Sequence, residues 1–339
     1  MNFPSQTKTV AALCFLALSG LTHAQITFGT KLEVVVANSV SYFHDAIPYG
    51  EYATSQRQTT PATGGRNFRA WTNIGDVVSV NGKPAKGVMT SWHTVIGLST
   101  NPANGQAISD VNGRLSQTFA VLEILQQDGT PVGSLMLQGT TFGPVVPGRP
   151  SGGQGANFAI VGGTGAFLGA RGFSGQVRTN PGLIVGAASV SEDPGIRRSR
   201  PGDEWTYRMT VIPMNAPEVI TTASGPAVVH SSDFTTVTPA KPARPGEVVS
   251  LFARHLGPTT STAEPGQPFP ETPLQPVNSP VEILVNGTPA EILAATGYPG
   301  SIDGYQVNFR LPADTASGSA IVRLSVAWMA APDFRIRVQ

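Results

Sequence analysis

The stretch NFAIVGGTGAFLGARGFSG, residues 157–175, decides which fold the chain adopts. An apolar, strand-like run enters a turn that is dense in glycine, as it would in a nucleotide-binding protein. A dinucleotide fingerprint needs G-x-G-x-x-G between a strand and a helix. Here Gly163 and Gly165 have the required spacing, but Leu168 stands where the third glycine should be. The residues that follow have a glycine at every third position, which no stable helix would tolerate.

A structural role fits these glycines better than a phosphate site. The chain lacks the lysine of a Walker motif as well as the third fingerprint glycine. We predict that the motif residues Gly162, Gly163, Thr164, Gly165 and Gly172 let two strands and their connection pack closely. A bulge at Gly162-Gly163 would bend the first of these strands. The stretch therefore predicts neighbouring barrel strands and no bound nucleotide.

The composition of the whole chain indicates an all-β protein. Of 339 residues, 38 are glycine and 29 are proline, which are poor in helix interiors but suit turns between short strands. Strand patterns are separated by hairpin dipeptides such as Asn81-Gly82 and Asn286-Gly287. Charged residues make up 13% and the net charge is +1, which gives no reason to expect a nucleic-acid partner.

Strand patterns divide the chain into two units. In the first unit we expect strands at 31–38, 40–47, 68–80, 88–99, 114–127, 132–142, 157–165, 172–178 and 204–214. Apolar side chains occur on both faces of 114–127, which favours a closed antiparallel barrel over an open sheet. We place the barrel at about 26–214, a linker at 215–225 and a β-sandwich at 226–339. The sandwich strands are expected within 247–257, 281–296, 304–312, 319–328 and 334–339.

The N-terminus predicts a secretory signal peptide over residues 1–24. Lys8 precedes an apolar run of about 12 residues, and Thr22 and Ala24 occupy the −3 and −1 sites of cleavage. The run is too short to span a bilayer. We therefore expect a secreted protein, extracellular or periplasmic, with no membrane span after cleavage. Cys14 is the only cysteine, so the mature chain would have neither disulfides nor cysteine-bound metals.

The glycine stretch resembles the signature of dirigent proteins, and more loosely that of allene oxide cyclases. The resemblance is carried by residues 161–173 and, in order, by SYFHDA (41–46), DGTPVGSLMLQG (128–139) and EWTYRMTV (204–211). It covers about 28–214 and implies an eight-stranded antiparallel β-barrel with an apolar cavity. It also implies that Asp45 and Arg171 lie at that cavity, where a reactive, quinone-methide-like intermediate is handled.

The second unit resembles an immunoglobulin-like module of the IPT/TIG type found in secreted bacterial proteins. The matching segments are PARPGEVVSLFARHLGP (242–258), VEILVNGTPAEIL (281–293), GYQVNFRLP (304–312) and the terminal FRIRVQ. The resemblance implies an accessory Ig-like β-sandwich without chemistry of its own. The expected fold class is therefore all-β, a barrel followed by a sandwich.

Two charged residues are the candidates for catalysis. Inside an apolar barrel, desolvation would raise the pKa of Asp45, and Arg171 would bind an oxyanion or phenolate. The alternative interpretation is that Asp45 ends a strand while Arg171 pairs with a carboxylate at the rim. The candidates for a ligand pocket are His44, Trp71, Trp92 and Phe119. Core packing explains aromatic residues on strands equally well.

Histidine spacing gives no support for a metal site. The mature chain has His44, His93, His230 and His255, and none forms an H-x-H or H-E-x-x-H pair. We therefore expect no metal and no other cofactor.

The favoured function is non-enzymatic. The barrel would hold a small apolar ligand, and the sandwich would dock to a cell-surface or extracellular protein or to a polysaccharide. One alternative is a dirigent- or cyclase-type activity, lyase- or isomerase-like, that uses Asp45 and Arg171. Another is a structural envelope or matrix protein with a filled barrel. Association into homo-oligomers through the barrel is a further expectation.

Overall fold

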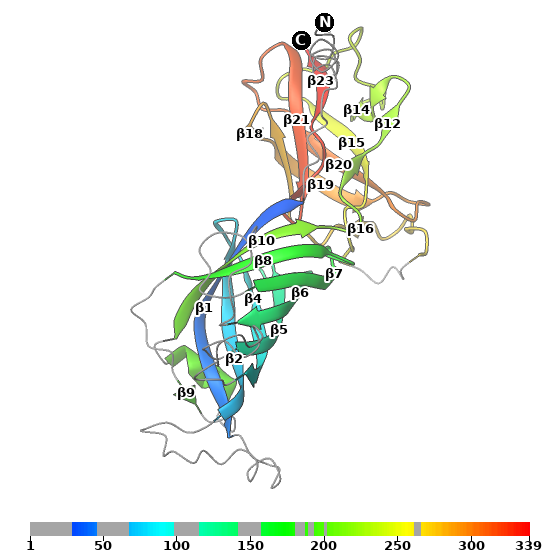
Figure 1. Cartoon of the computed structure of the whole chain (residues 1–339). Coiled ribbons are helices and arrows are strands. Elements are labelled where there is room, and N and C mark those ends of the chain that lie inside the picture. The colour runs from blue at the N-terminus through cyan, green and yellow to red at the C-terminus, as the bar shows by residue number, and fades with distance from the viewer. Residues whose placement is uncertain are drawn as a thin grey trace, which may run out of the picture.

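The computed structural model describes residues 29–45, 68–97, 115–141, 157–179, 187–188, 193–199, 202–260 and 266–339. In these ranges strands are the main regular elements, joined by turns and loops, and they form two units stacked end to end (Figure 1). The predicted signal peptide, residues 1–24, lies outside the described residues.

Eight antiparallel strands close into a barrel, which confirms the expected architecture of the first unit. They follow the order β1-β2-β4-β5-β6-β7-β8-β10, and β10 pairs with β1 to complete the ring. The barrel strands are β1 (Thr30–Asp45), β2 (Phe68–Val80), β4 (Lys86–Gly97), β5 (Leu115–Leu125), β6 (Pro131–Thr141), β7 (Asn157–Gly165), β8 (Arg171–Arg178) and β10 (Asp203–Ile212). Smaller elements of this unit are β3 (Lys83–Pro84), β9 (Ala187–Ala188) and the 3-10 helix η2 (Pro194–Ser199).

The first barrel strand is one continuous element, which corrects the expectation of two strands at 31–38 and 40–47. Asn38 lies between the two expected strands and has a left-handed backbone, with φ of 52°. The register with β10 shifts between Val36 and Ser39, so Asn38 lies in a bulge and not in a turn. Asparagine tolerates this conformation better than most residues, which is why a turn residue interrupts the pattern without ending the strand.

The glycine stretch forms the β7–β8 pair, and residues 166–170 connect the two antiparallel strands. These five described residues form a turn, so no helix follows β7. The register between β6 and β7 shifts between Ile160 and Gly162, so the bulge is centred on Val161, one residue before the predicted position. Thr164 is bound to β6, because its Oγ1 lies 2.7 Å from the hydroxyl of Ser134.

Backbone crowding explains why side chains are missing at two motif positions. A Cβ atom on Gly163 would lie 2.3 Å from the carbonyl oxygen of Phe167 and 2.8 Å from that of Ser134. A Cβ atom on Gly172 would lie 1.9 Å from the carbonyl oxygen of Thr210. Gly162 differs, since its nearest neighbour would be the Met136 sulfur at 3.6 Å, an ordinary contact.

The two ends of the barrel have connections of different length. At the end facing the second unit, short segments join the strands: 81–85, 126–130 and 166–170. At the opposite end, the described strands are separated by longer intervals of sequence: 46–67, 98–114, 142–156 and 179–202. Apolar side chains from seven barrel strands form a buried core. This core includes Leu32, Val77, Met89, Leu122, Leu135, Ile160 and Met209.

The second unit consists of two antiparallel sheets that share one hydrophobic core. One sheet contains β11 (Glu218–Val219), β14 (Val228–His230), β15 (Val248–Arg254), β16 (Gln275–Pro276), β19 (Glu291–Gly297) and β20 (Gly304–Arg310). The other contains β17 (Val281–Val285), β18 (Thr288–Pro289), β21 (Gly318–Val326), β22 (Met329–Ala330) and β23 (Phe334–Val338). A separate hairpin joins β12 (Thr221–Thr222) to β13 (Gly225–Pro226). The core draws on both sheets, for example through Leu251, Phe309, Ile283 and Leu324.

The interval 215–225, expected to be a linker, belongs in part to the second unit. β11 pairs with β15 there, and Val219 is buried in the second core. The β12 strand also falls within it. The chain therefore passes from one unit to the other over very few residues.

A two-residue turn from the second unit enters the core of the barrel. Val326 of β21 pairs with Met329 of β22, and the turn residues Ala327 and Trp328 both have a left-handed backbone, with φ of 48° and 64°. Ala327 and Met329 are buried as members of the barrel core, and Trp328 packs against it. The second unit therefore closes one end of the barrel (Figure 1).

Hydrogen bonds between backbone and amide groups add to this junction. The Gln126 amide donates to the carbonyl of Asn278 at 2.6 Å. The Asn278 amide in turn donates to the carbonyl of Pro131 at 2.9 Å. An ion pair joins Lys83 and Glu282 at 2.8 Å, but both side chains are well exposed, so it contributes little.

Replacing Trp328 by alanine should weaken both units together. The change removes the largest side chain that the second unit packs on the barrel core, and we expect the free energy of unfolding to fall by about 2 kcal/mol. Calorimetry should then show the single transition broadening or splitting in two. Trp92→Ala is the matched control, because Trp92 is 45% exposed on the barrel. Equal effects of the two substitutions would contradict a coupled junction.

Candidate functional site

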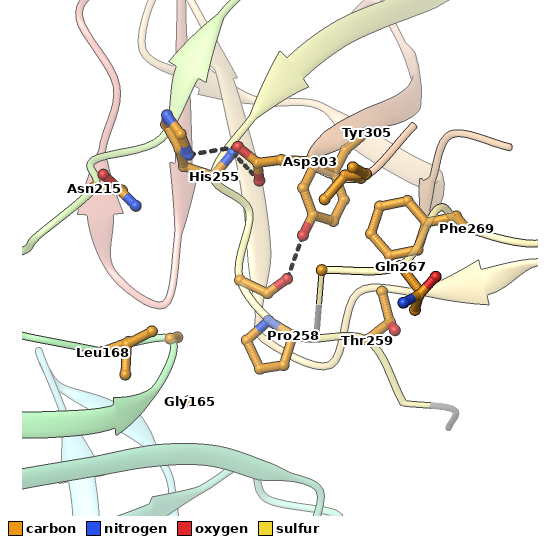
Figure 2. Close-up of a pocket in the computed structure, with 14 residues that line it drawn as sticks. Gly165, Leu168, Asn215, His255, Pro258, Thr259, Gln267, Phe269, Asp303 and Tyr305 are labelled. Atoms are coloured by element: carbon orange, nitrogen blue, oxygen red, sulfur yellow. Dashed lines mark hydrogen bonds and ion pairs between the residues drawn. The ribbon is translucent and has the colours of Figure 1, made fainter. Parts of the chain in front are cut away.

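The candidate site is an open cleft between the two units, with a volume of about 440 Å³. Both units contribute to its walls, as Figure 2 shows. The residues that line it are Gly165, Ala166, Leu168, Asn215, His255, Gly257, Pro258, Thr259, Gly266, Gln267, Phe269, Ile302, Asp303 and Tyr305. Clefts of this size at the boundary of two units are a frequent location of ligand sites.

One wall of the cleft is the tip of the glycine stretch. Gly165 ends β7 with φ of 61°, and the chain turns through Ala166 and the exposed Leu168. Gly257 approaches from the second unit, and a Cβ atom there would lie 3.5 Å from Ala166. The crowded turn that distinguishes the barrel sequence therefore also shapes the cleft.

The opposite wall is aromatic. Tyr305 of β20 is buried and donates its hydroxyl hydrogen to the carbonyl of Gly257 at 2.6 Å. The ring of Phe269 packs edge-on against Tyr305, with 5.3 Å between the ring centroids. Burial raises the pKa of the Tyr305 phenol, and the nearby Asp303 raises it further. The phenol is therefore neutral at physiological pH and fixes the Gly257 loop.

An imidazole and a carboxylate face each other on the second-unit side of the cleft (Figure 2). Nδ1 of His255 lies 2.6 Å from Oδ2 of Asp303, and the His255 backbone N–H donates to Oδ1 at 3.2 Å. His255 has a left-handed backbone with φ of 60°. Both oxygens of the Asp303 carboxylate therefore contact His255. These two contacts hold the strained backbone of His255 in place.

The remaining polar groups of the cleft are neutral. They are the amides of Asn215 and Gln267 and the hydroxyl of Thr259 (Figure 2). Within the described part of the chain, none of these three side chains makes a hydrogen bond to the protein. They are therefore available to a bound molecule.

A second polar cluster lies inside the barrel around His93. Its Nε2 lies 3.0 Å from the Asn73 amide and 2.9 Å from the Ser91 hydroxyl, and its Nδ1 lies 3.0 Å from the Thr118 hydroxyl. Trp71 stacks on the imidazole, with 4.4 Å between centroids and 6° between planes. Burial lowers the pKa of His93 to about 4, so the ring is neutral at physiological pH.

The hydrogen bonds assign the tautomer of this imidazole. Ser41 donates to the Asn73 carbonyl oxygen at 2.6 Å, which turns the Asn73 amide nitrogen toward His93. The amide then donates to Nε2, so Nδ1 carries the hydrogen and donates to Thr118. Both ring nitrogens of His93 thus have hydrogen-bond partners within the protein, as is usual for a histidine buried in a core.

The predicted catalytic pair does not form one site. Arg171 begins β8 and pairs with Ile212, at the end of the barrel where β1 begins with Thr30. Asp45 ends the same β1, some 15 residues further on, which corresponds to roughly 45 Å of extended strand. The Arg171 side chain is exposed and donates to the carbonyl of Val161 at 2.6 Å. The strand register therefore places Asp45 and Arg171 at opposite ends of the barrel.

The predicted aromatic lining is divided between the two faces of the barrel. Trp71 is buried inside. Trp92 and Phe119 pair across β4 and β5, and each is 45% exposed on the outer face, so neither lines the interior. The alternation of β4 explains this, because its neighbour His93 occupies the inner face. The side chains of His44 and Asp45 lie outside the description; the backbone places both at the end of β1.

Sequence reasoning does not find the cleft, because its parts are far apart in the chain. The proline-rich stretch 259–280 has the composition of a surface loop, although Phe269 within it is buried. His255 and Gly257 have the pattern of a strand end. The glycine motif marks the turn that forms one wall of the cleft, but it does not indicate which segments of the second unit form the other wall.

Comparison of the chain with models of known families, with curated proteins and with solved structures finds no match in any of the three. Among the described residues, no group of three or more His, Cys, Asp or Glu side chains is arranged to hold a metal ion. In the same residues, no helix has the length and apolar character needed to cross a membrane.

Proposed function

We propose that this chain is an exported, non-enzymatic binding protein that holds a small molecule in the cleft between its two units. The observation that carries the proposal is the cleft itself: about 440 Å³, walled by the glycine turn on one side and by Phe269 and Tyr305 on the other. Free polar groups and apolar side chains line it together, which is the usual composition of a ligand site.

The sequence resemblances agree with this function. A dirigent-like barrel followed by an Ig-like module would combine a ligand-handling unit with an accessory one, and the second unit here supplies part of the cleft. Export through the predicted signal peptide would bring the protein to small molecules outside the cell. N-terminal sequencing of the secreted protein, with Gln25 as the expected first residue, tests the export.

Binding in the cleft should be weakened when a bulky side chain is placed on the wall that the glycine turn forms. We expect Leu168→Arg to weaken binding of small neutral compounds at least about tenfold, because Leu168 lines the cleft and is 63% exposed, so the longer side chain fills the cleft without disturbing a core. Ligand-observed NMR with a library of neutral compounds measures this.

The matched control is Ile196→Arg. Ile196 is also an exposed apolar residue, but it belongs to η2 and does not line the cleft. Binding by the native chain and the control, with loss in Leu168→Arg, is expected. A library without any binder, or binders unaffected by Leu168→Arg, would overturn the proposal.

The barrel interior is a second candidate for the ligand. The stacked Trp71 and His93 lie away from the filled end of the barrel, toward the long connections. A small apolar molecule that entered the barrel at this end would contact the Trp71 ring, which is buried in the free chain. Loss of binding in a Trp71→Leu variant, with Leu168→Arg unaffected, would favour this location.

An enzymatic role and a purely structural role both have weaker support than binding. A dirigent- or cyclase-type activity shared by Asp45 and Arg171 would need them close together, and they belong to opposite barrel ends. A purely structural role is supported by the filled core of the barrel, but it leaves the cleft and its free polar groups without a purpose.

A further inference from the structure

The charges of the cleft indicate what kind of molecule it accepts. Among the described residues that line it there is no lysine or arginine, and the one carboxylate, Asp303, has both oxygens engaged by His255. An anionic ligand would therefore meet no opposite charge, and a cationic one would have to compete with the imidazole. Burying an unpaired charge is costly. The cleft is suited to a neutral ligand.

The free polar groups indicate hydroxyl groups on that ligand. The amides of Asn215 and Gln267 and the hydroxyl of Thr259 each donate and accept hydrogen bonds. A ligand hydroxyl does the same, so it can pair with any of the three in either direction. A purely apolar ligand would leave these groups without partners and would strip water from them.

The apolar surfaces of the cleft complete the pattern. Pro258, Leu168 and Phe269 present carbon surface between the polar groups, as the labelled side chains in Figure 2 illustrate. A sugar ring offers C–H faces to such surfaces and hydroxyls at its edge. The cleft volume of about 440 Å³ lies within the range of small-ligand sites and accommodates one or two such rings.

We infer that the cleft binds a neutral saccharide unit, a mono- or disaccharide or the end of a longer glycan. This inference rests on the proposed function, because it names the ligand class of the same cleft. Asn215 marks one end of the binding surface, and Gln267 and Thr259 mark the other (Figure 2).

Titration calorimetry of the full chain tests the inference with defined probes. These are the neutral disaccharides maltose, cellobiose and lactose, the pair glucose and glucuronate, and indole as an uncharged apolar probe. We expect at least one neutral sugar to bind, and glucuronate to bind about tenfold more weakly than glucose.

Amide variants identify the contacts. Gln267→Leu and Asn215→Leu keep the side-chain size and remove the hydrogen-bonding groups, so sugar affinity should fall about tenfold or more while indole binding is retained. Gln138→Leu is the control, since Gln138 is exposed on β6 and does not line the cleft. Each variant's far-UV circular dichroism establishes that it is folded.

The outcomes separate this inference from the proposed function. Indole binding that is lost in Leu168→Arg, together with no binding of any sugar, would overturn the saccharide inference and leave the cleft as an apolar ligand site. Sugar binding unaffected by Gln267→Leu and Asn215→Leu would also overturn it. Absence of binding by every probe would overturn both.

Discussion

Gly163→Ala should destabilise the protein by about 3 kcal/mol or more, whereas Gly162→Ala should change the free energy of unfolding by less than about 1 kcal/mol. The two glycines are neighbours in β7, and neither has a left-handed backbone. At Gly163 a methyl group would lie 2.3 Å and 2.8 Å from two carbonyl oxygens. Moving these backbone oxygens would disrupt the pairing of the sheet, so the steric strain destabilises the folded barrel.

Denaturant unfolding followed by tryptophan fluorescence measures both variants. The comparison isolates crowding, because the two substitutions add the same methyl group to adjacent residues of one strand. Gly162 would meet only the flexible Met136 side chain. Similar stabilities for the two variants would contradict the interpretation that close backbone packing explains the missing side chains.

Acid should destabilise the barrel through His93. Burial lowers the pKa of His93 to about 4, against 6.5 for the free side chain, so between these values the unfolded chain binds a proton that the folded chain excludes. Stability therefore falls as the pH drops through this window. The total loss attributable to His93 is about 3 kcal/mol, and it is complete below pH 4.

His93→Gln isolates this contribution, because glutamine keeps a donor and an acceptor but does not titrate in the window. We expect the pH dependence of the free energy of unfolding to be less steep for the variant than for the native chain by up to about 1.4 kcal/mol per pH unit. The described hydrogen-bond partners of His93, namely Asn73, Ser91, Thr118 and Thr141, are uncharged. Should the variant not fold, NMR titration of the native imidazole gives the same test. Protonation near pH 6.5 would contradict the account.

Much of the barrel could be predicted from the sequence because its signals are local. Alternating or continuous apolar runs bounded by turn residues set the bounds of β2 and β7 correctly. Asn81 and Gly82 both have a left-handed backbone in their hairpin, as the dipeptide indicates. Such features depend on a few neighbouring residues, so a single sequence contains them.

The junction could not be predicted, because its turn carries no recognisable signal. Ala327 and Trp328 adopt a conformation that usually requires asparagine or glycine, and the packing of both against the barrel core compensates for the strain. From the sequence they continue a strand. The cleft depends on the same contact between distant segments, so no local pattern reveals it either.

The inner and outer faces of the barrel are also difficult to assign from the sequence. In β4 the inward Ser91 and His93 alternate with the outward Trp92 and Thr94, so polarity does not distinguish the faces. An aromatic residue such as Trp92 is expected inside the barrel. The inner positions of β4 are instead occupied by Ser91 and His93, which are hydrogen-bonded to each other. Likewise the distance between Asp45 and Arg171 depends on strand register, which the motif positions do not reveal.

The location of the ligand is tested most directly by amide chemical shifts of the full, deuterated chain, titrated with the neutral compound that binds most tightly. The account predicts shifts at Gly165–Leu168 of the barrel and Gly257–Thr259 of the second unit, because these segments face each other across the cleft. Shifts confined to the strands around Trp71 and His93, or none at saturating ligand, would contradict it.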